Sequence, residues 1–196
     1  MTIDCGNQMA MWTKKRTSLA LMGALTLIVL WGCAPRLAPA LPAGIALQPG
    51  RYLTASYRAP DFPANRTTYA LEPFTMAAAQ GVAPETFQAQ FQEELSRAFK
   101  DNGLKLDPQS DTRLAGTVQQ VAVKGAFFRF IAGKISVHLV VSAAITRGDD
   151  LLFACQDRIS LDSPVNPGPP APREAELLLQ QAARTFAVHL LNELLL

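Results

Sequence analysis

The sequence predicts an α+β fold, a two-layer sandwich in which two amphipathic helices lie on one face of a mostly antiparallel sheet. Two stretches, 83–103 and 174–194, carry apolar side chains at helical spacing. Between them, residues 133–150 alternate apolar and polar side chains, which is typical of a strand with one covered face. The order of strands, helix, three strands and helix fits two helices packed on one face of an antiparallel or mixed sheet.

Residues 1–32 are predicted to be a signal peptide. Lys14, Lys15 and Arg16 precede Leu19–Trp31, a run of 13 residues without charge. A membrane-spanning helix needs about 20 apolar residues, whereas a signal-peptide core needs only about 7–15 after a positive segment. The run therefore favours a cleaved leader, and an uncleaved N-terminal anchor is the alternative.

The end of this run, Leu30-Trp31-Gly32-Cys33, resembles the lipobox of bacterial lipoproteins, with Trp31 where that pattern usually has a small or β-branched residue. The resemblance implies cleavage between Gly32 and Cys33, a lipid on Cys33 and acylation of the new N-terminus. Because one acyl chain anchors only weakly, a triacylated Cys33 would give stable membrane attachment. Ala34 stands where an Asp would imply retention in the inner membrane, so the resemblance favours the periplasmic face of the outer membrane over the inner membrane.

Residues 33–50 form a predicted Pro/Ala-rich tether, and residues 51–196 form a predicted single periplasmic domain. The stretches 51–57 and 67–74 are rich in Tyr and Thr and are bounded by Pro, Asn or Asp, so both are predicted strands. Pro73 has no N–H for a ladder and is expected at a strand end or edge.

The first helix is predicted over residues 83–103. Pro84 suits the first turn, and Gly103 suits a left-handed C-terminal cap. Glu93 and Glu94 are expected on a solvated face. The apolar stripe expected in the core consists of Phe87, Phe91, Leu95 and Phe99.

Three strands are predicted next, over residues 112–125, within 133–150 and over 151–161, with a hairpin turn at Arg147–Asp150. The core-facing side of the middle strand is expected to consist of Ile135, Val137, Leu139, Val141, Ala143 and Ile145. The core-facing stripe of the last helix is expected to consist of Leu179, Ala183, Phe186, Leu190 and Leu194.

The charge of the mature chain argues against nucleic acid as a partner. The whole sequence has a formal net charge of +2, but removal of residues 1–32 leaves 15 basic and 15 acidic side chains. Binding to nucleic acid requires a basic surface that neutralises phosphates.

The sequence contains no motif that predicts an enzyme, a metal site or a cofactor. Cys155 lies in an apolar strand and is expected to be a small core residue without a disulfide partner. His138 and His189 are 51 residues apart and lack the spacing of metal ligands, so both are expected to be surface or packing histidines. Nucleophile-elbow, phosphate-loop and dinucleotide motifs are absent from the sequence.

One segment, residues 124–134, contains a candidate contact patch. Phe127, Phe128, Arg129 and Phe130 lie there between two glycines and two lysines. At the tip of a hairpin these aromatic side chains could contact a protein or lipid, with the basic residues meeting acidic headgroups. The alternative, which we favour, is that alternate aromatic side chains complete the core.

Residues 65–195 resemble a group of small proteobacterial lipoproteins that includes the YajG-like proteins, with a looser similarity to LptE-like and transport-auxiliary lipoproteins. The similarity lies in the lipobox, the helix ending at NGLKL and the segment LAGTVQQVAVKGAFFRFIAGKISVHLVVSAAI. It implies a non-enzymatic accessory or assembly role in the cell envelope, with an envelope protein as partner. The alternative function is a binding module for a small apolar or envelope-derived ligand in a groove between sheet and helices.

Overall fold

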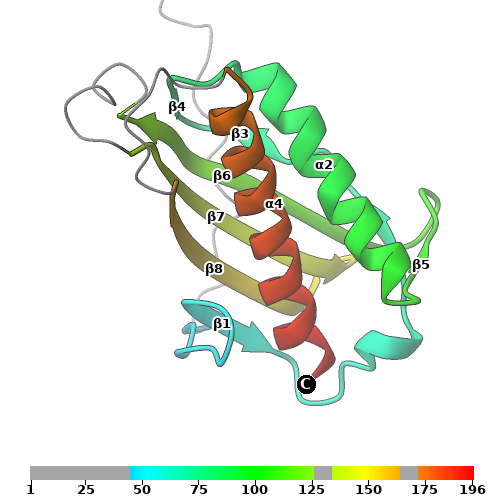
Figure 1. Ribbon diagram of the computed structural model, residues 1–196. Helices are drawn as coiled ribbons and strands as arrows, with labels where there is room; N and C mark the ends of the chain where they lie inside the picture. Colours follow the sequence, from blue (N-terminus) through cyan, green and yellow to red (C-terminus); the bar gives the residue numbers. More distant parts are fainter. Residues whose placement is uncertain (1–44, 126–133, 164–171) are drawn as a thin grey trace, which may run out of the picture. The chain divides into compact units, whose positions relative to one another are not determined.

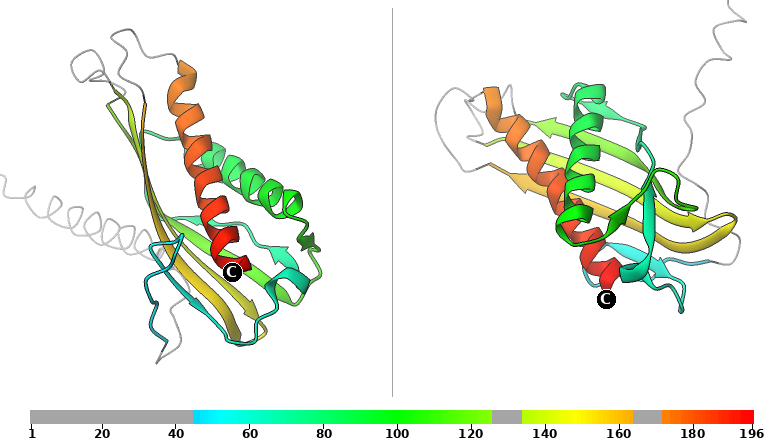
Figure 2. Two further views of the ribbon diagram at one scale, coloured as in Figure 1. Left: turned by 60° about the horizontal axis from the view of Figure 1, so that its bottom comes forward. Right: turned by 90° about the vertical axis from the view of Figure 1, so that its right-hand side faces the viewer.

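The computed structural model describes residues 45–125, 134–163 and 172–196. These residues form an eight-stranded sheet with two long helices on one of its faces (Figures 1 and 2). The predicted α+β two-layer sandwich is confirmed. None of the helices in the described residues is long and apolar enough to cross a membrane.

Three long strands make the centre of the sheet. β6 (Thr112–Lys124), β7 (Ser136–Arg147) and β8 (Asp150–Asp162) pair antiparallel in sequence order, and β7 and β8 form the predicted hairpin. The tight β7–β8 connection includes Gly148, whose φ of 56° lies in the left-handed region that glycine adopts readily. A short strand, β1 (Ala55–Arg58), pairs antiparallel with part of β8 at one edge.

The opposite edge was only partly predicted. There β2 (Thr68–Leu71), β3 (Thr75–Met76) and β4 (Ala79–Gln80) pair parallel with successive parts of β6. β5 (Lys105–Leu106) pairs parallel with β2, and a 3-10 turn, η2 (Ala64–Arg66), precedes β2. Instead of one strand over residues 67–74, β2 ends before Pro73, which has no N–H for a ladder.

A bulge in β6 keeps its apolar side chains facing the helices. Leu114, Gly116 and Val118 follow the period of two, and the register then shifts before Gln120. Val121 is again fully buried because the extra residue restores the inward direction. The three-residue step from Val118 to Val121 is the sequence signal of this bulge.

Both helices place their predicted stripes in the core. α2 (Pro84–Asp101) is followed by Gly103 with a φ of 73°, as expected of a left-handed cap. α4 (Pro172–Leu195) lies beside α2 on the sheet (Figure 1). The buried stripe residues, all as predicted, are Phe87, Phe91, Leu95 and Phe99 on α2 and Leu179, Ala183, Phe186, Leu190 and Leu194 on α4.

Aromatic rings fill the space between the helices and the sheet. The Phe74 ring lies 5.1 Å from the Phe91 ring and 6.4 Å from the Phe186 ring, measured between centroids, and Phe91 and Phe186 stack at 5.5 Å. Gly116 makes room for this cluster, because a Cβ atom there would overlap the Phe74 ring and approach the Ser142 carbonyl oxygen to 2.6 Å. The interlayer space is therefore close-packed here.

A second aromatic cluster closes the end of the layer near β5. Tyr69 packs edge-on against Phe62 and Phe99, with centroid distances of 6.5 and 5.4 Å. Its hydroxyl donates to the Ala64 carbonyl oxygen at 2.7 Å, and burial raises the pKa of Tyr69 to about 12. This buried phenol thus stays neutral and holds η2 against the core.

Candidate functional site

The residues singled out for lipid attachment and contact lie outside the described residues. These are Gly32 and Cys33 at the predicted cleavage point and Phe127, Phe128, Arg129 and Phe130 in the predicted contact patch. The domain boundaries at residues 32 and 50 likewise remain predictions.

Cys155 is buried in the core, as predicted. Burial is the main reason that the pKa of its thiol lies far above the ordinary range. Because the thiolate is the reactive form, Cys155 is a packing residue and a poor nucleophile.

The two histidines lie on opposite faces of the sheet. His138 points away from the helices, and its Nδ1 atom lies 2.9 Å from Ser160 Oγ. His189 is on α4, on the helix side. In the part of the chain that the structure describes, no group of three or more His, Cys, Asp or Glu side chains could hold a metal ion.

The Asp157 carboxylate joins three segments of the fold. The residue is only 3% exposed, and its Oδ2 atom lies 2.9 Å from His189 Nδ1. The backbone N–H and the hydroxyl of Thr54 both donate to Oδ1 at 3.2 Å, and the Arg158 N–H donates to it at 2.9 Å. Asp157 thereby connects β8 to α4 and to the segment before β1. Both oxygens of this buried carboxylate therefore have hydrogen-bond partners within the protein.

Glu193 makes a second connection between the same segment and α4. Its carboxylate accepts a hydrogen bond from the Tyr52 N–H at 2.8 Å and one from the Ser56 hydroxyl at 2.9 Å. The residues that follow the predicted tether are thus fixed to the end of α4 by two carboxylates.

The prediction that Glu93 and Glu94 both lie on a solvated face is wrong for Glu94. Glu93 is exposed, but Glu94 is 4% exposed and lies at the seam between the helices. Arg97 Nη1 and Gln180 Nε2 donate to its Oε1 atom at 2.9 and 2.8 Å. The physical reason is helical spacing: Glu94 follows Phe87 by seven residues and so shares the buried side of α2.

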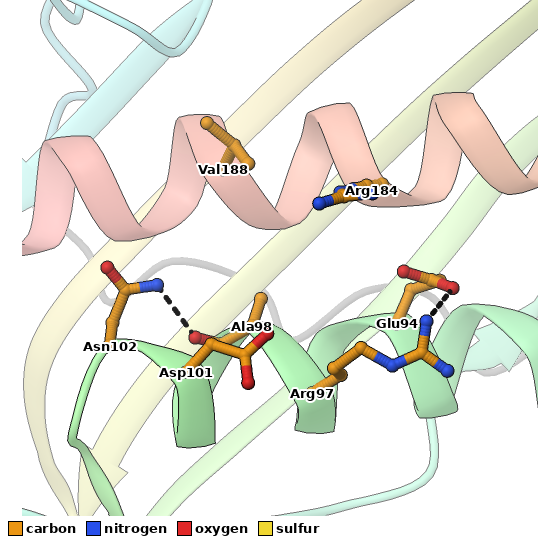
Figure 3. Close-up of a pocket in the computed structure, with 7 residues that line it drawn as sticks. All are labelled: Glu94, Arg97, Ala98, Asp101, Asn102, Arg184 and Val188. Atoms are coloured by element: carbon orange, nitrogen blue, oxygen red, sulfur yellow. Dashed lines mark hydrogen bonds and ion pairs between the residues drawn. The ribbon is translucent and has the colours of Figure 1, made fainter.

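A shallow hollow of about 170 Å³ lies on the outer side of this seam (Figure 3). Glu94, Arg97 and Asp101 line it from α2, and Arg184 and Val188 line it from α4. Each Glu94 contact above is made within the protein, so this carboxylate is a structural anchor at the floor of the hollow. The side chains that line the hollow are mostly charged, with a few small apolar ones among them. Such a lining suits contact with another surface better than catalysis.

No family model matches this chain, and a search of curated proteins also gives no match. Several solved structures are similar to it. The PelC dodecamer from Paraburkholderia phytofirmans has 10% sequence identity and a TM-score of 0.43, covering 70% of this chain and 95% of that chain. Protein XCC0632 from Xanthomonas campestris, of family DUF330, has 13% identity and a TM-score of 0.44, covering 68% and 86%.

A protein from Caulobacter crescentus that is provisionally described as a lipoprotein has 13% identity and a TM-score of 0.39, covering 61% of this chain and 86% of that chain. At identities and TM-scores this low, the similarities carry no inference about what this chain binds or does.

Proposed function

We propose that this protein is a lipid-anchored lipoprotein of the bacterial cell envelope with a non-enzymatic accessory or assembly role. The carrying observation is the Leu30–Cys33 sequence, which resembles a lipobox and follows a positive segment and a short apolar run. In this proposal Cys33 carries the lipid, the periplasmic face of the outer membrane is the location, and a protein of the envelope is the partner.

The packing between helices and sheet supports an accessory role over a ligand-binding one. A small apolar ligand would need a pocket between the two layers. Rings of Phe74, Phe91 and Phe186 occupy that space, and Tyr69 and Phe99 occupy the end near β5. A filled interior of this kind leaves the outer surfaces to make functional contacts.

The anchor is tested by expressing the full chain and its Cys33→Ala variant in a Gram-negative host. The expected wild-type product sediments with the outer membrane, and its N-terminal peptide begins at Cys33 with the added mass of three acyl chains. The variant should remain unlipidated and either uncleaved or soluble. A wild-type chain that keeps residues 1–32 and carries no acyl mass would overturn this proposal.

The partner is tested by crosslinking the intact wild-type lipoprotein in membranes and purifying it with what it has captured. The expected result is an envelope protein that is recovered with the wild-type chain and is not recovered with the unlipidated Cys33→Ala variant. Recovery of a small apolar molecule in stoichiometric amount from the purified chain would instead favour the ligand-binding function.

A further inference from the structure

The side of α4 that faces neither the sheet nor the core carries exposed apolar side chains. Leu177 is 62% exposed and Val188 is 44% exposed. Between them lie Gln181 and Arg184, so the four residues follow the spacing i, i+4, i+7 and i+11. This spacing places them on one ridge of the helix, which we call the outer α4 stripe.

The outer α4 stripe is flanked by hollows. One of them is the hollow drawn in Figure 3. A second hollow, of about 190 Å³, is lined by Leu177, Gln181 and Arg184. A third hollow, of about 430 Å³, is lined by Gln181, Arg184 and Val188. Arg184 lines all three hollows. In the described part of the chain, no hydrogen bond or ion pair engages its guanidinium, which is exposed.

The stripe has the same chemical order in both directions. Read from either end it is apolar, polar, polar, apolar, and its midpoint lies between Gln181 and Arg184. A two-fold axis through that midpoint would bring Leu177 against Val188 of a second copy. It would also bring the Gln181 amide oxygen, an acceptor, to the Arg184 guanidinium of the second copy, a donor.

The complementarity extends one step beyond the stripe. The same axis places Glu176 opposite His189 of the second copy. Glu176 is exposed, and His189 uses Nδ1 for Asp157, which leaves Nε2 directed away from that contact. Each such interface would therefore contain two apolar pairs, two amide–guanidinium pairs and two carboxylate–imidazole pairs.

We propose that the outer α4 stripe is a self-association surface that pairs antiparallel with the same stripe of a second copy. The self-complementary order of Leu177, Gln181, Arg184 and Val188 carries this proposal, together with the unengaged guanidinium of Arg184. It is independent of the lipid on Cys33 and of the envelope partner.

Paired cysteines test the register of the two helices. In the full chain, solubilised in mild detergent, Leu177→Cys plus Val188→Cys should give a covalent dimer with a short thiol-reactive crosslinker. Each single variant should not, because residue 177 and its symmetry mate lie about 16 Å apart along antiparallel helices. The wild-type chain is the control for Cys5, Cys33 and Cys155.

A charge exchange tests the same register without crosslinking. Gln181→Arg would face Arg184 of the second copy and should weaken the dimer about tenfold, measured by sedimentation. Adding Arg184→Glu should restore the affinity by creating two Arg–Glu pairs. Thermal unfolding of each variant separates loss of the dimer from loss of the fold.

Removing the apolar pairs is the strongest perturbation. Leu177→Lys plus Val188→Lys should raise the dimer dissociation constant about 100-fold, while Tyr52→Lys, an exposed apolar residue before β1, should leave it unchanged. A wild-type chain that stays monomeric at high micromolar concentration would overturn the proposal. Crosslinking of the single cysteine variants, or a failure of the charge exchange to restore the dimer, would also overturn it.

Discussion

The inner and outer sides of the α2–α4 pair are built from different chemistry. On the inner side, Phe91 and Phe186 stack at 5.5 Å and close over Phe74. On the outer side, Arg97 and Arg184 border a hollow whose floor is the buried Glu94 (Figure 3). The inner side fixes how the helices sit on the sheet, and the outer side exposes charged groups such as the Arg184 guanidinium to solvent. Stability and function are therefore expected to respond to mutations on opposite sides of the same two helices.

The largest effect is expected from Phe186→Ala. This change removes the ring that contacts both Phe74 and Phe91 and leaves a cavity, so it should lower the free energy of unfolding by about 3–5 kcal/mol. Urea unfolding followed by circular dichroism measures it. Leu195→Ala, at the exposed end of α4 and outside the outer α4 stripe, is the control and should cost about 0.5 kcal/mol or less. A loss below about 1 kcal/mol for Phe186→Ala would contradict a close-packed interlayer space and reopen the ligand-binding function.

The second largest loss of stability is expected from Asp157→Ala, at the junction of α4, β8 and the segment before β1. The change leaves the Thr54 donors and His189 without their acceptor, so it should cost about 2–3 kcal/mol. His189→Ala removes one donor of four and should cost less, about 1 kcal/mol. Amide hydrogen exchange should show faster exchange around Thr54 in Asp157→Ala. Equal losses of unfolding free energy for the two variants would mean that the Asp157–His189 contact alone stabilises the junction.

Glu94→Ala is expected to have a smaller effect, because the Glu94 carboxylate accepts two hydrogen bonds and the Asp157 carboxylate accepts four. Arg97 is exposed and Gln180 is half-buried, so neither becomes an unsatisfied buried donor when the carboxylate is removed. The expected cost is about 1–2 kcal/mol, and Glu94→Gln, which keeps an acceptor oxygen, should cost less than 1 kcal/mol. Thermal melts of the two variants compare them. A cost like that of Phe186→Ala would place Glu94 with the inner side of the helix pair.

Regular periodicity explains which parts of the fold could be predicted from the sequence. Alternation over Ile135–Ile145 and the stripe of Phe87, Phe91, Leu95 and Phe99 extend over many residues, so they define long elements without knowledge of their partners. β3 and β4 contain two residues each and pair parallel with a distant strand, so no local pattern predicts them.

The burial of the two carboxylates has a weaker signal in the sequence, and it was not predicted. Asp157 has the inward parity of Phe153 and Cys155 on β8, and Glu94 lies at the spacing of the α2 stripe. Position alone could have predicted their burial. Their partners could not be predicted, because His189 and Gln180 come from α4, whose rotation and depth on the sheet depend on packing.

The smallest effect is expected from Asp162→Asn at the exposed end of β8. Hydrogen bonds from Lys134 Nζ at 2.8 Å and from Ser136 Oγ at 2.6 Å hold the pKa of Asp162 below its usual value. A carboxylate with a lowered pKa in the folded state adds stability above its unfolded pKa, and this is lost as pH falls through the folded pKa. Solvent and salt screen this pair, so the variant should melt almost like the wild type at neutral pH. The small difference should shrink further on acidification and in high salt, as followed by thermal melts across that range. A loss at neutral pH as large as that of Glu94→Ala would show that this surface contact, too, holds the fold.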